Sequence, residues 1–261
     1  MTLVTLRVGV LGAGGRMGAE ACRAVAGDPA LTLVAAVDPH HAGGHASGVT
    51  IAAEVDALAA AGAEVAVHFT LVDAARENLA WCAAHGVHAV VGTSGLTGAD
   101  LDELRASFPV DGEGPNCLVV PNFAIGAVLM MRFAEMAAPF FETAEIIELH
   151  HDGKADAPSG TAIATAGRMA AASSDWTADA GTDEVLPGAR GGSGAAGIKV
   201  HSVRLRGLVA HQEVLLGTTG QTLSIRHDTT DRSCFMPGVL LAVKAVAGRP
   251  GLTVGLDSLL W

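Results

Sequence analysis

The sequence contains no tyrosine and very little lysine. Without tyrosine, the chain cannot use the Tyr-Lys proton relay on which one large class of dehydrogenases relies. The lysines are Lys154, Lys199 and Lys244, against thirteen arginines. Because lysine is so rare in this chain, the position of Lys154 is informative. It marks the stretch ELHHDGKADAPSGTA, residues 148–162, as a candidate site.

Basic charge and long apolar runs are also scarce. The formal net charge is -11, which argues against a nucleic-acid surface because a phosphate backbone is bound by clustered Lys and Arg. No apolar run approaches the ~20 residues of a membrane helix. The first residues, MTLVTLRVGVLG, lead directly into a strand pattern rather than a secretory signal. We therefore expect a cytoplasmic protein with no nucleic-acid or membrane partner.

Cysteines are few and scattered. Cys22, Cys82, Cys117 and Cys234 form no CxxC pair, and no histidine stands at the spacing of a metal finger. We expect reduced, buried thiols at these positions and no metal.

The first 120 residues alternate short apolar strands with amphipathic helices. Strands are expected at 7–12, 31–38, 63–70 and 88–95, and a fifth strand running into a turn at 117–126. Helices are expected at 16–26 and 72–86. The segment RVGVLG at 7–12 is a continuous apolar run, as a parallel strand buried on both faces should be. Strands and helices alternating at this spacing predict a parallel α/β sheet with right-handed crossovers.

The pattern changes after about residue 144. A strand at 144–151 is followed by a helix with Ser159 as its N-cap and by a glycine-rich loop at 187–197. Alternating apolar and polar residues then predict strands at 198–207, 210–217 and 221–228. This region predicts a second domain with an antiparallel or mixed sheet. The tail, CFMPGVLLAVKAVAGRPG, is expected to be helical and to pack back on the first domain.

A glycine-rich turn, GAGGRMG, follows the first strand and opens the first helix. Gly12, Gly15 and Gly18 are spaced G-x-x-G-x-x-G, with Gly14 also available. Backbone N–H groups and the positive end of the helix dipole can meet a pyrophosphate there without interference from a Cβ. Asp38 ends the second strand, where a dinucleotide fold places the carboxylate that binds the adenosine ribose. The combination predicts a dinucleotide site.

The choice between NADH and NADPH stays open at this point. Asp38 favours NADH because a carboxylate repels a 2′-phosphate, whereas Arg16 within the loop could offset that repulsion. His40 and His41 either assist at low pH or are solvated loop residues. A glycine-rich turn that binds no nucleotide is the alternative to a dinucleotide site. The absence of GxxxxGK[ST] argues against an ATP-type phosphate-binding loop.

The stretch HHDGKADAPSGT admits several interpretations. A metal site is disfavoured because His150 and His151 are adjacent on a strand and point to opposite faces. A nucleophile at Ser159 lacks the GxSxG elbow, and a serine before glycine at a helix start is usually a cap. An anion-binding acid-base site remains: the helix start offers N–H groups to a carboxylate, Lys154 adds charge, and a histidine exchanges protons near neutral pH. A merely solvated loop is the alternative.

Together, GAGGRMG and ELHHDGKADAPSGTA resemble the dihydrodipicolinate reductase family of diaminopimelate and lysine biosynthesis. The family motif E-x-HH-x-x-K-x-DAPSGTA is matched at Glu148, His150, His151, Lys154 and Asp156 through Ala162. Further matches are GTSG at 92–95, PNFAIG at 121–126 and VRLRGLVAHQEVLLG at 203–217, the last similar to the actinobacterial branch. The resemblance covers most of the chain.

The resemblance implies a fold, an assembly and a reaction. Residues 1–121 and 231–261 would form a Rossmann-type dinucleotide-binding domain with a parallel sheet. Residues 122–230 would form a smaller α+β domain with a mixed sheet, which binds substrate and builds a homotetramer. The reaction would be NADH- or NADPH-dependent reduction of 4-hydroxy-tetrahydrodipicolinate, a small cyclic dicarboxylate, to tetrahydrodipicolinate with loss of water.

The resemblance also implies residue roles. His150 and Lys154 match the catalytic proton-transfer positions, and substrate carboxylates would be held by His151, Gly160 and Thr161. The cofactor would be held by Gly12, Ala13, Gly14, Gly15, Arg16, Met17, Asp38, Gly92, Thr93, Ser94, Val120, Pro121, Asn122 and Phe123.

Two positions depart from the family pattern. His68 stands where the third strand usually carries the aspartate of DFT, and the proline that usually follows is absent. GTSG replaces GTTG, which keeps the hydroxyl. Two other functions stay open: a reductase of the same plan with a different acid substrate, and a non-catalytic NAD(H)-sensing protein, for which loss of Lys154 or His150 would be the natural sign.

Overall fold

The structure is a computed structural model that describes residues 5–111, 114–179, 181 and 183–261. It contains two compact units. The first combines Met1–Phe123 with Phe235–Trp261, and the second is Ala124–Cys234.

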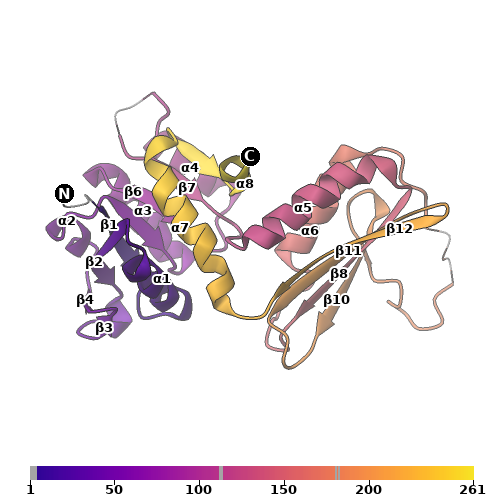
Figure 1. Cartoon of the computed structure of the whole chain (residues 1–261), viewed down its shortest axis with the longest axis horizontal. Helices are drawn as coiled ribbons and strands as arrows, with labels where there is room; N and C mark the ends of the chain where they lie inside the picture. The colour runs from indigo at the N-terminus through magenta and orange to yellow at the C-terminus, as the bar shows by residue number, and fades with distance from the viewer. Residues whose placement is uncertain (1–4, 112–113, 180, 182) are drawn as a thin grey trace. The chain divides into compact units, whose positions relative to one another are not determined.

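The first unit is built on an eight-stranded sheet in the order β13-β7-β6-β5-β1-β2-β4-β3 (Figure 1). All neighbouring strands are parallel except the short β3–β4 pair. The strands are β1 Leu6–Leu11, β2 Leu31–Val37, β3 His45–Ala46, β4 Val49–Ala52, β5 Val65–His68, β6 His88–Val91, β7 Cys117–Val119 and β13 Leu252–Val254. The helices are α1 Arg16–Gly27, α2 Ala57–Ala60, α3 Val72–His85, α4 Gly98–Ser107, α7 Met236–Ala245 and α8 Asp257–Leu260.

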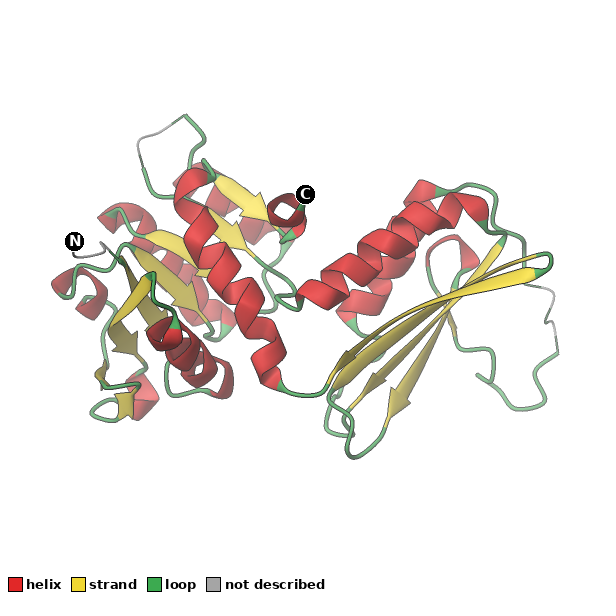
Figure 2. Cartoon of the chain, viewed as in Figure 1, coloured by secondary structure: helices red, strands yellow, loops and turns green. Residues whose placement is uncertain are grey.

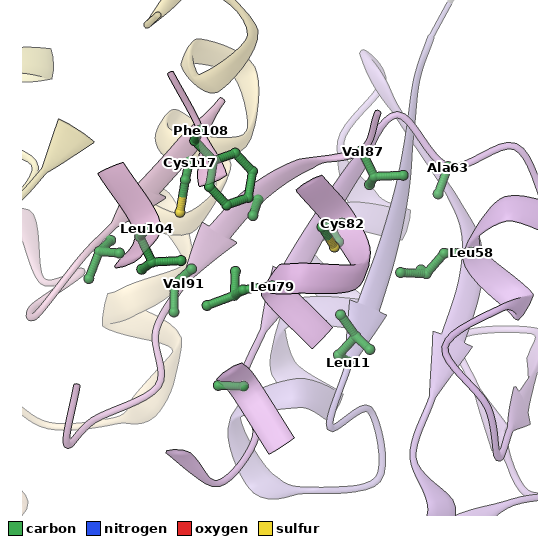
Figure 3. Packing of buried hydrophobic residues seen from close by; sticks show 14 of the residues in the cluster. Leu11, Leu58, Ala63, Leu79, Cys82, Val87, Val91, Leu104, Phe108 and Cys117 are labelled. Atoms are coloured by element: carbon green, nitrogen blue, oxygen red, sulfur yellow. The ribbon is translucent and has the colours of Figure 1, made fainter. Parts of the chain in front are cut away.

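The core of this unit lies between the sheet and its helices. The buried cluster in Figure 3 includes Leu11 of β1, Leu79 and Cys82 of α3, Leu104 of α4 and Phe108. Leu79, Cys82 and Phe108 have no exposed surface. Because β5 and β6 are buried over nearly their full length, their continuous apolar sequences are explained by helices on both faces.

The C-terminal segment completes the first sheet. β13 pairs in parallel with β7, from Leu252 opposite Cys117 to Val254 opposite Val119. The Asn116 amide donates to the carbonyls of Val246 and Ala247 at 3.1 and 2.9 Å, and its oxygen accepts from Gly251 N–H at 3.1 Å. The buried Asn116 side chain thus hydrogen-bonds the C-terminal segment to the chain next to β7.

The second unit is a five-stranded mixed sheet in the order β12-β11-β8-β10-β9, with two helices (Figure 2). β8–β10 is parallel, and the other pairs are antiparallel. The strands are β8 Thr143–His150, β9 Gly192–Ser193, β10 Lys199–Arg204, β11 Ala210–Thr218 and β12 Gln221–Thr229. The helices are α5 Ile125–Ala137 and α6 Gly160–Ala172.

The helices of the second unit lie on one face of its sheet (Figure 2). Gln212 Nε2 of β11 donates to Thr165 Oγ1 of α6 at 2.8 Å. Side chains alternate between faces along a strand, so Ile146 and Glu148 of β8, both fully buried, share this helix-covered face.

One expected element differs from the structure. The segment 117–126 was expected to be a strand running into a turn; the strand ends at Val119, and α5 begins at Ile125, inside the expected turn. Pro121 explains the early end, because proline has no N–H to continue a sheet ladder. Elements not expected from the sequence are α2, α4, α5, α8, β3, β4, β9 and β13. Among the described residues, no helix is long and apolar enough to cross a membrane.

Candidate active site

The glycine loop, residues 12–18, joins β1 to α1 in a conformation that side chains would block. Gly12 has φ +78°, and a Cβ there would lie 2.3 Å from the Phe69 carbonyl oxygen. A Cβ on Gly18 would approach the Gly12 carbonyl oxygen to 1.9 Å. Gly15 is the N-cap of α1, and Arg16 is its exposed first residue. The N-terminus of α1 is therefore surrounded by backbone atoms of the glycine loop with no side chain in the way. A pyrophosphate binds at such a helix N-terminus.

Asp38 directly follows β2 beside this loop and is only 6% exposed. Its Oδ2 accepts from Gly14 N–H and its Oδ1 from His40 N–H, both at 3.0 Å. His41 Nδ1 lies 3.1 Å from Oδ2. Burial opposes ionisation of Asp38, but hydrogen bonds from His41, His40 and Gly14 outweigh burial and keep the pKa of its carboxyl below the ordinary value.

Two buried hydroxyl groups lie after the ends of β5 and β6. Within the described structure, Thr70 Oγ1 and Thr93 Oγ1 are buried and have no hydrogen-bond partner. Gly92 precedes Thr93 and donates from its N–H to the His68 carbonyl at 2.9 Å. A Cβ on Gly92 would lie 2.3 Å from the Phe69 ring. Unpaired buried hydroxyls are rare in proteins, and a polar ligand at these strand ends would satisfy them.

The other cofactor residues expected from the sequence follow β7. Val120 N–H donates to the Val91 carbonyl at 2.8 Å, which holds the segment against β6. The Phe123 ring lies 5.8 Å from that of Phe69, centroid to centroid. Gly12, Ala13, Gly14, Gly15, Arg16, Met17, Asp38, Gly92, Thr93, Ser94, Val120, Pro121, Asn122 and Phe123 thus follow the carboxyl ends of β1, β2, β6 and β7, strands of one parallel sheet. The buried hydroxyl groups of Thr70 and Thr93, which have no partner among the described residues, and the glycine loop fit a dinucleotide bound at these strand ends.

The second group of expected residues lies in the second unit, where β8 ends. His150 is the last residue of β8, and its Nδ1 lies 2.5 Å from Glu148 Oε2. Glu148 also accepts two hydrogen bonds from Arg204 at 2.9 and 2.8 Å and one from Ser159 N–H at 3.2 Å. A carboxylate with these donors fixes both the ring orientation and the tautomer of His150: Nδ1 carries the proton and Nε2 is available for exchange.

The electrostatics of this cluster have identifiable causes. Burial opposes ionisation of Glu148, but the Arg204 guanidinium and the other donors keep the pKa of its carboxyl below the ordinary value. For His150, burial is the largest influence and lowers the pKa, while Glu148 acts in the opposite direction. A mostly neutral His150 at pH 7 can accept a proton and return it.

Lys154 and the start of α6 provide positive charge near His150 in the sequence. Lys154 Nζ contacts both carboxylate oxygens of Asp156 at 2.7 Å. Ser159 caps α6, since its hydroxyl accepts from Ala162 N–H at 3.2 Å. Gly160 and Thr161 are the first residues of the helix, where its dipole favours an anion. His151, also expected to bind substrate, is exposed beyond the end of β8.

Three residues that the sequence reasoning did not assign take part in these clusters. Arg204 lies 56 positions from Glu148 in the sequence and reaches it because β10 pairs in parallel with β8. Glu148 was matched only as part of a motif, and its burial was not foreseen. Thr70 follows His68 by two residues, and only its burial without a partner singles it out.

His68, the departure from the family pattern, is fully buried in the first unit. Its Nε2 lies 3.7 Å from Cys82 Sγ of α3, and its Nδ1 has no partner among the described residues. The side chain therefore belongs to the packed interface of β5 and α3. Among the described residues, no group of three or more His, Cys, Asp or Glu side chains could hold a metal ion.

The chain is similar to known proteins over nearly its whole length. The family model described as the dihydrodipicolinate reductase N-terminus matches residues 6–123, and the model of the C-terminus matches residues 126–260. A 4-hydroxy-tetrahydrodipicolinate reductase of Nocardia farcinica is 53% identical over 98% of this chain and 99% of its own length. The enzyme of the same name from Streptomyces coelicolor is 49% identical, with 98% of each chain covered.

A solved structure supports the same comparison. The dipicolinate-bound dihydrodipicolinate reductase from Paenisporosarcina sp. TG-14 superimposes with a TM-score of 0.87 at 37% sequence identity. The alignment covers 98% of this chain and all of the other. Both units therefore have counterparts in one solved protein.

Proposed function

The chain belongs to the dihydrodipicolinate reductase family, and on that premise we propose that it reduces 4-hydroxy-tetrahydrodipicolinate to tetrahydrodipicolinate, with loss of water, at the expense of NADH or NADPH. The observation that carries the proposal is the cluster at the end of β8. There a buried, fully hydrogen-bonded Glu148 orients His150 next to the start of α6.

The residues of the second unit bind and orient a small dicarboxylate. A substrate carboxylate lies at the N-terminus of α6, at Gly160 and Thr161, with His151 as a further contact. Lys154 exchanges Asp156 for the substrate and adds three N–H donors to the anion. His150 exchanges the accompanying proton through Nε2, since Glu148 holds Nδ1. Positioning and charge neutralisation are the protein's part of the catalysis.

The residues of the first unit hold the dinucleotide. The glycine loop and the N-terminus of α1 bind the pyrophosphate, and Asp38 and its neighbours face the adenosine ribose. Gly92, Thr93 and Ser94, with Val120–Phe123, hold the nicotinamide riboside, and Thr70 provides one more hydroxyl. Bound NADH or NADPH supplies the hydride.

A coupled assay tests the proposal. Pyruvate and aspartate semialdehyde provide the substrate in situ through the preceding enzyme, and absorbance at 340 nm follows oxidation of each cofactor. Lys154→Ala and His150→Ala should each lower kcat by about 100-fold or more, with little change in the dissociation constant for NADH. Lys199→Ala is the matched control, because Lys199 contacts Ser193 on β9 and should leave kcat unchanged. Full activity of both site variants would contradict the roles assigned here.

The second unit also suggests the assembly. Ile147, Leu149, Val203 and Leu215 lie on the sheet face opposite α5 and α6, here called the open sheet face. All are half-buried in the single chain. Apolar side chains on a sheet face need a cover, and a second copy of the chain provides one in a closed, symmetric homotetramer. We place the enzyme in the cytoplasm, where its four cysteines, all free thiols, would stay reduced.

A further inference from the structure

The start of α6 is attached to the sheet of the second unit by two buried polar side chains, Glu148 of β8 and Gln212 of β11. These two residues lie directly opposite each other in the antiparallel β8–β11 pair, so their side chains leave the same, helix-covered face. Glu148 is fully buried and Gln212 is 4% exposed. Two neighbouring strands therefore each present one polar group to the same helix.

A chain of two hydrogen bonds runs from Gln212 to the first turn of α6. Gln212 Nε2 donates to Thr165 Oγ1 at 2.8 Å, and this hydroxyl donates to the Thr161 carbonyl at 2.7 Å. Because a hydroxyl has a single hydrogen, Thr165 can only accept from the amide, which fixes the direction of the chain. Thr165 is fully buried, and at such a position an unmade hydrogen bond is costly.

The attachment to Glu148 reaches the residue just before this turn. Ser159, the N-cap of α6, donates its N–H to Glu148 Oε1 at 3.2 Å. Gly160 and Thr161 thus lie between one attachment at Ser159 and another at the Thr161 carbonyl. Glu148 also holds the ring of His150. The helix start and the histidine are therefore held by the same pair of strands.

Stability alone does not account for an amide at position 212. Gln212 Oε1 is buried and has no partner within the part of the chain that the structure describes. A half-satisfied buried amide is less favourable than an apolar side chain of the same shape. The buried face of α6 is otherwise apolar, with Ala162, Ala166 and Met169. Apolar packing is non-directional and allows small displacements of a helix along a sheet, whereas hydrogen bonds fix its position.

We propose that Gln212 and Thr165 are positioning residues for the substrate carboxylate. Through the Thr161 carbonyl they hold the first turn of α6, and with it the backbone N–H groups that meet the carboxylate. The inference rests on the proposed function in taking Gly160 and Thr161 as the carboxylate site. Because Glu148 holds His150 independently, loss of Gln212 or Thr165 weakens carboxylate binding and leaves proton transfer intact.

Binding of a dicarboxylate to the full-length protein tests the proposal. Dipicolinate, which has no hydroxyl to lose, is titrated calorimetrically in the presence of NADH, and KM and kcat are measured in the coupled assay. Gln212→Met keeps the length of the side chain without its N–H, and Thr165→Val keeps the shape without the hydroxyl. Each should raise the dipicolinate Kd and the KM by about 5-fold, the order of a contact at a helix N-terminus, and change kcat by less than about 2-fold.

Three further variants separate positioning from general loosening. Thr165→Ser keeps the hydroxyl and should restore Kd to within about 2-fold of the wild type. Combining Gln212→Met with Thr165→Val should raise Kd by about 5-fold and not by about 25-fold, because both residues act in one chain. Val214→Ala is the matched control: it shortens a fully buried side chain on the same face of β11 and should lower the urea midpoint without changing Kd.

Wild-type affinity in both Gln212→Met and Thr165→Val would overturn the proposal, as would an equal loss in Val214→Ala or in Thr165→Ser. If Gln212→Met did not fold, the two Thr165 variants would decide alone. A wild type with no affinity for dipicolinate would overturn the carboxylate site and the positioning role together. Failure of the reductase gives a different result. A wild type that binds dipicolinate with this dependence on Gln212 and Thr165 but never oxidises NADH refutes the reaction and leaves the positioning role standing.

Discussion

At the scale of single residues, Glu148 is the most constrained side chain of the candidate site. It is a fully buried carboxylate that accepts hydrogen bonds from Arg204, His150 and Ser159. A buried charge is tolerated only when its partners are complete, and removing one partner leaves the others uncompensated. Glu148 is thus a positioning residue that acts through His150.

Glu148→Gln should lower turnover and move its pH dependence. Gln keeps the shape but removes the charge that raises the pKa of His150 against the effect of burial. The pKa of His150 should therefore fall further, and the protonated ring should persist only at lower pH. We expect kcat to fall by about 10-fold or more, with its alkaline limb displaced to lower pH. A kcat profile from pH 5 to 8.5 measures both effects.

Glu142→Gln provides the control, because Glu142 precedes β8 and is exposed. A Glu148→Gln enzyme whose kcat fell with no displacement of the profile would indicate a structural role alone.

At the scale of elements, the packing of α3 on β5 encloses an ionisable group. Burial lowers the pKa of His68 to about 3, whereas in the unfolded chain a histidine has its ordinary pKa of about 6.5. Between these values the unfolded state binds more protons than the native state. The free energy of unfolding therefore decreases as the pH falls through this window and is fully retained above about pH 6.5.

His68→Leu should reduce this acid sensitivity. Over the interval from pH 7 to 5 the wild type should lose about 2 kcal/mol more of its unfolding free energy than the variant does. Urea unfolding followed by circular dichroism at both pH values gives the comparison. His40→Leu, at an exposed position, should behave like the wild type. Equal losses in His68→Leu and the wild type would show that His68 is protonated in the native state.

The elements differ in how well the sequence predicted them. The long apolar strands and the helix capped by Ser159 follow from periodicity and cap chemistry, and the mixed second sheet is confirmed. α5 was missed because it has no side-chain cap and its sequence, IGAVLMM, is apolar on every face. β13 has three residues, too few for a pattern.

The two candidate sites show the same limit. The sequence predicted functional roles for the glycine loop and the His150–Lys154 stretch, because each lies within a short segment. It could not show that Arg204 reaches Glu148 or that His41 packs on Gly14 and contacts Asp38. The first contact depends on strand pairing across 56 positions, and the second on how a short loop folds over Gly14.

At the scale of the whole molecule, the open sheet face should determine the oligomeric state. Ile147 lies near the centre of β8, opposite His201 of β10 and Glu213 of β11. Ile147→Lys would place a charge in an interface that pairs two such faces, where an unpaired buried charge is costly. We expect the variant to form dimers or monomers instead of tetramers. Size-exclusion chromatography with light scattering measures the mass.

Val110→Lys is the matched substitution in the first unit, at a position that is 67% exposed, and should not alter the mass. An Ile147→Lys protein of unchanged mass would mean that the open sheet face is not the interface. A wild type that is monomeric at all concentrations would reject the assembly itself.

The pairing of β13 with β7 also affects how the chain folds during its synthesis. β7 is complete once residue 119 has been made, yet its neighbour on one side in the sheet is Leu252–Val254, more than a hundred residues later in the chain. Until β13 has been synthesised, β7 presents an unpaired parallel edge, which is a template for pairing with other chains. The nucleotide-binding unit can therefore close only after β13 has been made, and premature termination anywhere upstream of β13 would leave an incomplete sheet.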